Sequence, residues 1–130
     1  MQAAGVGKHI ISQPGRHTEQ GGMDATQLLL ASQHRPTAIF ASNDLAAFGV
    51  LSVAKDQGLR VPEELSVIGF DNPSMSRIAA IDLTTVDQRG SDQAARAVSL
   101  LLERLDGRTE PRRVVVEPNL VRRSTTAMAR

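Results

Sequence analysis

Several features are missing from this chain of 130 residues, and each absence excludes a class of function. The sequence has no cysteine, which excludes thiolate catalysis, disulfide frameworks and cysteine-ligated zinc or iron–sulfur sites. It has no excess of one charge: 15 Lys and Arg against 14 Asp and Glu leave a formal net charge of +1, so no general attraction for nucleic acid or an anionic membrane is encoded. No apolar run approaches the ~18 residues of a membrane span, and residues 1–7 lack the apolar core of a signal peptide. We therefore expect a soluble, cytoplasmic protein with no membrane partner.

The sequence also lacks the short motifs of common enzyme classes. It contains no GxSxG nucleophile elbow, no glycine-rich phosphate loop ending in GK[ST], no GxGxxG and no HExxH. His9, His17 and His34 do not have the spacing of metal ligands. We therefore predict that the chain is not an enzyme and binds neither a metal ion nor a cofactor.

The apolar residues that are present follow an alternating pattern. Short β-type runs alternate with longer runs of helical period, which is typical of a parallel sheet covered by helices. The length and the 41% apolar content suit one compact domain. The predicted fold class is α/β, a three-layer sandwich with a mainly parallel sheet. Strands are predicted at 9–12, 37–41, 65–70, 83–86 and 114–116, and helices at 18–33, 45–57, a short segment through 78, and 91–106.

Two of the predicted helices have informative apolar patterns. The helix over 45–57 is apolar almost all round, so we expect two of its faces to be covered. The helix over 91–106 is cleanly amphipathic and is terminated by Gly107. Near the start of the first helix, Gly21 and Gly22 each cost about 1 kcal/mol relative to Ala, which indicates that another part of the chain approaches the backbone there.

In an open parallel sheet the loops that follow the strands line one edge, where helices begin and ligands bind. Three such loops, 14–17, 42–44 and 71–72, present polar side chains that can hydrogen-bond a hydroxyl-rich or anionic small molecule. The candidates are Arg16, His17, Asn43 and Asp71. Each also has a purely structural interpretation, since Asn is a good helix cap, Asp a common turn residue, and charged loop residues are usually solvated. The residues alone leave both interpretations open.

Five stretches occur in an order that is specific when taken together. They are RPTAIFASND at 35–44, AFG at 47–49, GLRVPEELSVIGFD at 58–71, LTTVDQ at 83–88 and LVRRSTT at 120–126. In this order they closely resemble the effector-binding domain of LacI/GalR-type transcriptional regulators, over nearly the whole chain.

Members of that family join an N-terminal helix-turn-helix to a two-subdomain body that is similar to periplasmic sugar-binding proteins and holds the effector between its subdomains. The resemblance implies that residues 1–130 are the C-terminal subdomain of such a ligand-sensing domain, of the periplasmic-binding-protein-like type I. It implies that DNA is contacted only through a helix-turn-helix outside this chain. It also implies that the segment 84–107 crosses to the first subdomain, which this chain lacks.

The resemblance also implies roles for single residues. It assigns ligand contact to Asn43 and Asp71, and it places Gln88 where the chain returns between the subdomains. His17 falls where relatives often carry an aromatic residue that stacks on a sugar ring, and Arg16 falls at a neighbouring polar position. The helix that contains Phe48 lies at the subunit interface of relatives, so a homodimer is expected.

The implied crossover has an energetic consequence. Without a first subdomain, the apolar face of the helix over 91–106 has no partner in this chain. Exposing its six apolar side chains would forfeit on the order of 5 to 10 kcal/mol, at roughly 1 to 2 kcal/mol each. We therefore predict that this helix either folds back on its own sheet or swaps into a neighbouring molecule. The six side chains are Ala94, Ala95, Val98, Leu101, Leu102 and Leu105.

The residues and the family resemblance favour one function and leave two alternatives. The leading hypothesis is the part of a transcriptional repressor that senses a small-molecule effector, a sugar or a related compound, and controls operator binding allosterically. The first alternative is a solute-binding protein of a transport system, which an upstream signal peptide in place of a helix-turn-helix would support. The second is an α/β enzyme acting on sugars or nucleotides, which turnover lost on changing Asp71 to Asn would support.

Overall fold

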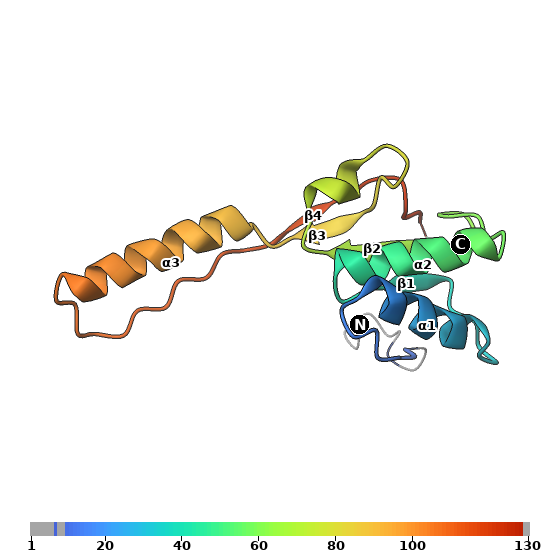
Figure 1. Cartoon of the computed structure of the whole chain (residues 1–130), viewed down its shortest axis with the longest axis horizontal. Helices are drawn as coiled ribbons and strands as arrows, with labels where there is room; N and C mark the ends of the chain where they lie inside the picture. Colours follow the sequence, from blue (N-terminus) through green and yellow to red (C-terminus); the bar gives the residue numbers. More distant parts are fainter. Residues whose placement is uncertain (1–6, 8–9, 129–130) are drawn as a thin grey trace.

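The computed structural model describes residue 7 and residues 10–128 of the chain (Figure 1). Its four strands form one sheet in the order β1-β2-β3-β4, in which β1, β2 and β3 are parallel and β4 runs antiparallel to β3. The predicted α/β class with a mainly parallel sheet is confirmed. In chain order the elements are α1 (Glu19–Leu30), β1 (Ala38–Phe40), α2 (Asp44–Asp56), β2 (Ser66–Phe70), the 3-10 helix η3 (Ser74–Arg77), β3 (Thr85–Asp87), α3 (Gly90–Leu105) and β4 (Asn119–Val121).

The core lies between the sheet and α2, and α1 packs along the outer side of α2 (Figure 1). Helix α2 therefore has two covered faces, as its apolar sequence predicted. The buried core residues come from β1, α2, β2 and the segments that flank them. They are Ile39, Ala41, Ala46, Ala47, Val50, Ala54, Leu65, Val67 and Leu83.

Glycines allow α1 and α2 to lie close together. A Cβ atom at Gly22 would lie 2.2 Å from the carbonyl oxygen of Ala46, and one at Gly49 would lie 2.2 Å from that of Glu19. At Gly21 a Cβ would lie 2.1 Å from the carbonyl oxygen of Gly15. The close approach predicted at the start of the first helix is confirmed, and it explains why poor helix formers stand there.

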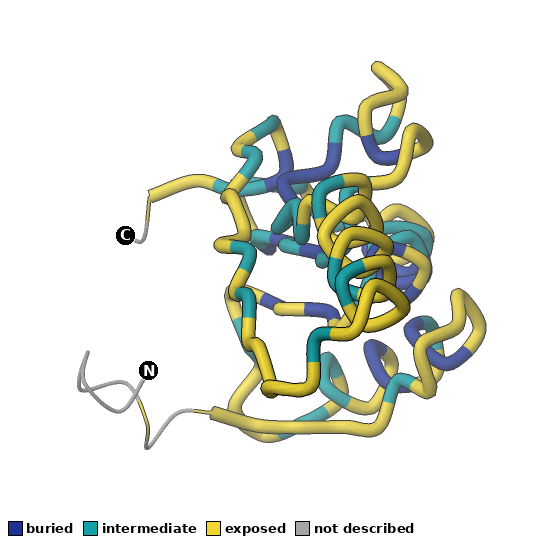
Figure 2. The backbone as a smooth tube through the Cα atoms, turned by 90° about the vertical axis from the view of Figure 1, so that its left-hand side faces the viewer, coloured by how far each residue is buried: buried dark blue, intermediate teal, exposed yellow. Residues whose placement is uncertain are grey.

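Residues 88–118 form an arm that projects from the end of the sheet (Figure 1). Helix α3 leads away from the sheet, and residues 107–118 return beside it without regular secondary structure. No residue of α3 is buried, whereas buried residues occur in the sheet, α1, α2, η3 and the segment after β4; Figure 2 colours the backbone by this burial. Of the two predicted outcomes for this helix, folding back on its own sheet is not the one that this structure has, and swapping into a neighbouring molecule stays a prediction.

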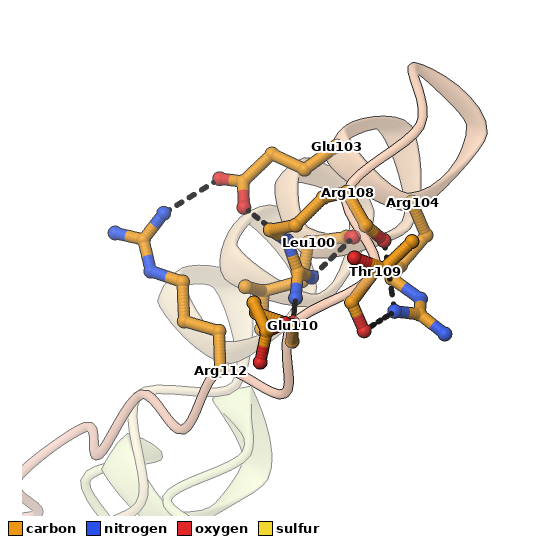
Figure 3. Close-up of polar contacts among 7 residues, drawn as sticks. All are labelled: Leu100, Glu103, Arg104, Arg108, Thr109, Glu110 and Arg112. Carbon is orange, nitrogen blue, oxygen red and sulfur yellow. Dashed lines mark hydrogen bonds and ion pairs between the residues drawn. The ribbon is translucent and has the colours of Figure 1, made fainter.

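Polar contacts hold the returning segment against the end of α3 (Figure 3). The Glu103 carboxylate lies 2.9 Å from Nε of Arg108 and 2.8 Å from Nη1 of Arg112. Arg104 Nη1 donates to the carbonyl oxygens of Arg108 at 2.8 Å and Thr109 at 2.6 Å. The arm is thus a helix with a strap fastened by charged groups rather than by a core.

Two predicted strands are not formed. Residue 9 lies outside the described residues, and residues 10–12 are irregular and exposed. Residues 114–116 are three β-branched valines, but they run beside a helix, which offers no ladder of backbone partners. A β-strand needs a neighbouring strand with which to pair, so these valines form no strand here despite their high β propensity. Within the part of the chain that the structure describes, no helix has the length and apolar character that crossing a bilayer requires.

Candidate functional site

The carboxyl ends of β1, β2 and β3 open onto one edge of the sheet, and each delivers a predicted site residue there. Asn43 follows β1 and caps α2, Asp71 follows β2, and Gln88 follows β3. Because the three strands are parallel neighbours, their carboxyl ends coincide. The edge predicted from the order of strands and helices is formed.

Asn43 is both a helix cap and a tie between two loops. Its Oδ1 accepts from the backbone N–H of Ala46 at 2.9 Å, and its Nδ2 donates to the carbonyl oxygen of His17 at 3.0 Å. Next to it, Oγ of Ser42 lies 3.1 Å from Nδ1 of His17. The loop before α1 is therefore fastened to the loop after β1, which brings His17 to the same edge.

Arg16 and His17 differ in how firmly they are held. Both adopt left-handed backbone conformations, with φ of 51° and 55°, and both are exposed. His17 is tied through its ring and its carbonyl group, whereas the side chain of Arg16 makes no hydrogen bond or ion pair within the described chain. His17 is therefore held at the edge, and Arg16 precedes it in the same loop.

Asp71 and Gln88 are in direct contact. Gln88 Nε2 donates to Asp71 Oδ1 at 2.8 Å, and the Asp71 N–H donates to the carbonyl oxygen of Val86 at 2.9 Å. Burial raises the pKa of the Asp71 carboxyl, the negative charge of Asp44 raises it further, and His17 lowers it. Asp71 is half-buried, and its carboxyl group accepts a hydrogen bond from Gln88.

The segment after Asp71 is tied to the last part of the chain. Asn72 donates from Nδ2 to Asp87 Oδ2 at 3.2 Å and accepts at Oδ1 from Nη2 of Arg123 at 2.7 Å. The same guanidinium donates from Nη1 to the carbonyl oxygen of Leu83 at 2.6 Å. These bonds join the loop after β2 to the base of the arm and to the segment after β4.

The residues that lie beneath this edge were not predicted from the sequence. Asp44 is fully buried and accepts hydrogen bonds from Ser76 and Thr85, which are 32 and 41 residues further along the chain. A spacing pattern cannot reveal partners so far apart. The one available signal was an acidic residue directly after the cap of an otherwise apolar helix.

Phe48 and a groove in the arm lie away from the edge. Phe48 is half-buried on α2, where it packs against the core residues. A groove of about 590 Å³ separates α3 from residues 114–117 and is lined by Arg89, Arg96, Ser99 and Glu117 among others. It is a gap in the arm, and none of the predicted site residues lines it.

No cluster of three or more potential metal ligands occurs among residues 10–128.

The chain is similar to known proteins both in sequence and in fold. A family model described as a periplasmic binding protein-like domain matches residues 1–126. The chain is 42% identical over 107 residues to the HTH-type transcriptional repressor PurR of Pasteurella multocida, which covers 82% of this chain and 32% of that protein. The chain spans about a third of the length of the curated relatives it matches.

Two solved structures show the same arrangement of elements. A LacI-family transcriptional regulatory protein from Corynebacterium glutamicum is 39% identical with a TM-score of 0.76, over 85% of this chain and 43% of that one. A LacI family transcriptional regulator from Enterococcus faecium with bound ribose is 32% identical with a TM-score of 0.77, over 88% of this chain and 42% of that one. The fold and the order of its elements are therefore shared with regulators.

Proposed function

Because the chain belongs to the periplasmic binding protein-like domain family, in the form found in LacI-type transcriptional regulators, we propose that it is the C-terminal subdomain of the effector-sensing body of a transcriptional repressor. In this proposal the whole protein contacts DNA through a helix-turn-helix outside these residues and works in the cytoplasm. The segment 84–107 then crosses to a first subdomain. The chain itself carries out no reaction.

The effector in this proposal is a sugar or a related hydroxyl-rich small molecule. One observation carries it: the contacts Asn43–His17 and Asp71–Gln88 gather an amide, an imidazole, a carboxyl group and a second amide from four segments at one edge. Together they offer donors and acceptors in the mixture that hydroxyl groups require. The ribose bound to the Enterococcus faecium regulator supports this class of ligand. Arg16, which has no partner of its own in the described chain, would add a charged donor for an anionic group.

The proposed signal is a shift between closure states of the two subdomains. Gln88 stands at the base of the arm and touches Asp71, so a ligand held at Asp71 is one hydrogen bond away from the segment that leads to the other subdomain. A coupling of a few kcal/mol is typical of allosteric regulators, and a few differential contacts suffice for it. Dimerisation through the face of α2 that carries Phe48 would transmit the shift to paired DNA-binding domains.

A transport-type solute-binding protein has the same architecture and is the second candidate. The name of the family model agrees with either function, whereas the relatives that share about 40% of this sequence are named as repressors. The sequence upstream of these residues separates the two candidates, since a helix-turn-helix belongs to the regulator and a signal peptide to the transport protein.

The test is a thermal-shift screen of sugars, sugar phosphates and nucleosides on the whole protein that carries this chain. A ligand at about 100 times its dissociation constant stabilises the folded state by roughly 2.7 kcal/mol, which a melting curve resolves easily. Asn43→Ala and Asp71→Ala should each remove the shift. Asp56→Ala and Gln57→Ala, at the exposed far end of α2, are matched controls that should retain it. A ligand whose shift survives both site substitutions would place the effector elsewhere.

A further inference from the structure

A buried carboxylate supports the candidate site from behind. Asp44, the first residue of α2, is fully buried, and no basic side chain forms an ion pair with it in the described part of the chain. A buried charge without an ion pair is costly unless hydrogen bonds compensate it. The fold must therefore satisfy this group in another way.

Three donors from three segments meet the Asp44 carboxylate. Oδ1 accepts from the Thr85 hydroxyl at 2.6 Å, and Oδ2 accepts from the Ser76 hydroxyl and from the backbone N–H of Asn72 at 3.2 Å. Thr85 and Ser76 are themselves fully buried. The N-terminal position in α2 adds the favourable end of the helix dipole. The carboxylate is thus held by β3, η3 and the loop after β2 together.

The strand beside it is shaped to leave room for the carboxylate. A Cβ atom at Gly69 would lie 2.1 Å from Oδ1 of Asp44, so only glycine permits this approach. Gly69 lies in β2, two residues before Asp71. The acid and the loop it contacts are therefore packed as one unit.

That loop needs support, because its backbone is strained. Asp71 and Asn72 have φ of 122° and 57°, which residues other than glycine adopt uncommonly and which are unfavourable in free chains. The bond from the Asn72 N–H to Asp44 fixes the peptide between these two residues. The orientation of the Asp71 side chain follows from that peptide.

We propose that Asp44 is a positioning residue of the ligand edge: its buried carboxylate fixes the left-handed backbone of Asp71 and Asn72 and so sets the direction of the Asp71 carboxyl group, without itself reaching the ligand. This inference deepens the proposed function and rests on it only for the statement that Asp71 meets an effector. The supporting role itself concerns the ligand-free protein.

Asp44 also acts on Asp71 through its charge. The charged groups around Asp71 are His17 before α1, Asp44 on α2, Asp87 on β3 and Arg123 after β4. Asp87 and Arg123 are hydrogen-bonded to the side chain of the next residue, Asn72. Asp44 raises the pKa of Asp71 and His17 lowers it. Removing the charge of Asp44 should therefore lower the pKa of Asp71 and move any ligand binding that depends on its ionisation to lower pH.

The test is an NMR titration of the Asp71 side chain without ligand in the unaltered protein and in Asp44→Asn. Asn retains the shape of Asp and can still accept from the Asn72 N–H, while the Thr85 hydroxyl can rotate to accept from its amide. We expect a lower pKa for Asp71 in Asp44→Asn. A folded variant in which this pKa is unchanged or raised would overturn the electrostatic effect of Asp44 on Asp71, whereas the positioning contact, which Asn retains, is tested by the exchange of the Asn72 amide.

Two controls separate charge from packing. Asp56→Asn removes the same charge at the exposed end of α2, roughly 18 Å along the helix and beyond the range of screened interactions, so the pKa of Asp71 should not move. Ser76→Ala removes a donor to Asp44 but leaves its charge, so the pKa of Asp71 should not fall. A fall in either control would mean that loosened packing moves this pKa.

A measurement on the unaltered protein tests the backbone contact even if Asp44→Asn does not fold. A hydrogen bond to a charged acceptor should slow exchange of the Asn72 amide roughly ten- to a hundredfold relative to an unstructured amide. Exchange at the unstructured rate would overturn the positioning role. Neither readout needs a ligand, so a failure here is distinct from a failure of the thermal-shift screen.

Discussion

In α2, seven of the thirteen residues are buried, whereas α3 has sixteen residues and buries none. The difference does not come from composition alone, because α3 has the sharper division between an apolar and a polar face. Helix α2 lies between the sheet and α1, and α3 has only a returning strap of chain beside it (Figure 1). An amphipathic pattern thus shows that a face is to be covered, and the neighbouring elements decide whether it is.

The largest contrast between the two regions is expected for Leu→Ala substitutions. Leu65→Ala, in the core where the side chain is 1% exposed, should lower the free energy of unfolding by about 2–5 kcal/mol, since it removes packed atoms and leaves a cavity. Leu101→Ala, in the arm where the side chain is 59% exposed, should change it by less than about 0.5 kcal/mol. Urea denaturation of the two variants measures both values. Equal losses would show that the arm is packed against something in solution.

Gly→Ala substitutions should repeat the contrast on a smaller scale. Gly22→Ala places a methyl group 2.2 Å from the backbone of α2, so the helices must separate, at a cost of about 1–3 kcal/mol. Gly90→Ala, at the start of α3, meets no atom within 4 Å and should be neutral or stabilising by a few tenths of a kcal/mol. The same denaturation assay compares them. A tolerated Gly22→Ala would mean that the contact between α1 and α2 is loose.

The two regions also show which parts of the fold could be predicted from the sequence. The strands at 37–41 and 65–70 were predicted from their own residues, and the structure forms β1 and β2 within those limits. The valines at 114–116 have equally strong β character, yet they form no strand because no strand lies next to them. Local composition was thus sufficient where the partner is part of the same body and insufficient in the arm.

Some residues of the candidate site could likewise be predicted from the sequence, and others could not. The positions of Asn43 and Asp71 at one edge followed from the alternation of strands and helices, because parallel order alone aligns the strand ends. The buried state of Asp44 did not follow, since it depends on hydroxyl groups 32 and 41 residues away that only the tertiary structure brings to it.

The exposed apolar stripe of α3 is expected to bring molecules together, because Leu101 and Leu105 are 59% and 74% exposed. Changing Leu101 and Leu105 to Lys should weaken self-association at least about tenfold, because each buried Leu contributes roughly 1.5–2 kcal/mol. Leu28→Lys is the matched control, since Leu28 is equally exposed, at 59%, but lies on α1. Sedimentation equilibrium over a range of concentrations gives the dissociation constants. A strictly monomeric protein whose Leu101 and Leu105 amides exchange freely would show that the face stays uncovered.

The smallest contrast is expected between two arginines. Arg112 in the arm pairs with Glu103 across a largely exposed surface, so Arg112→Ala should cost less than about 1 kcal/mol, and the loss should vanish at high salt. Arg123 in the body is half-buried and donates to the carbonyl of Leu83 and to Asn72, so Arg123→Ala leaves acceptors without a partner and should cost about 1–3 kcal/mol.

Denaturation at low and at 1 M salt distinguishes these two cases. A loss at Arg123 that salt does not reduce fits hydrogen bonds to buried acceptors, because these are shielded from the solvent ions that screen surface pairs. If Arg112→Ala costs as much as Arg123→Ala and resists salt equally, the strap of the arm is not a surface feature. The arm would then have to be regarded as a second packed unit, and the contrast between a closed body and an open arm would fail.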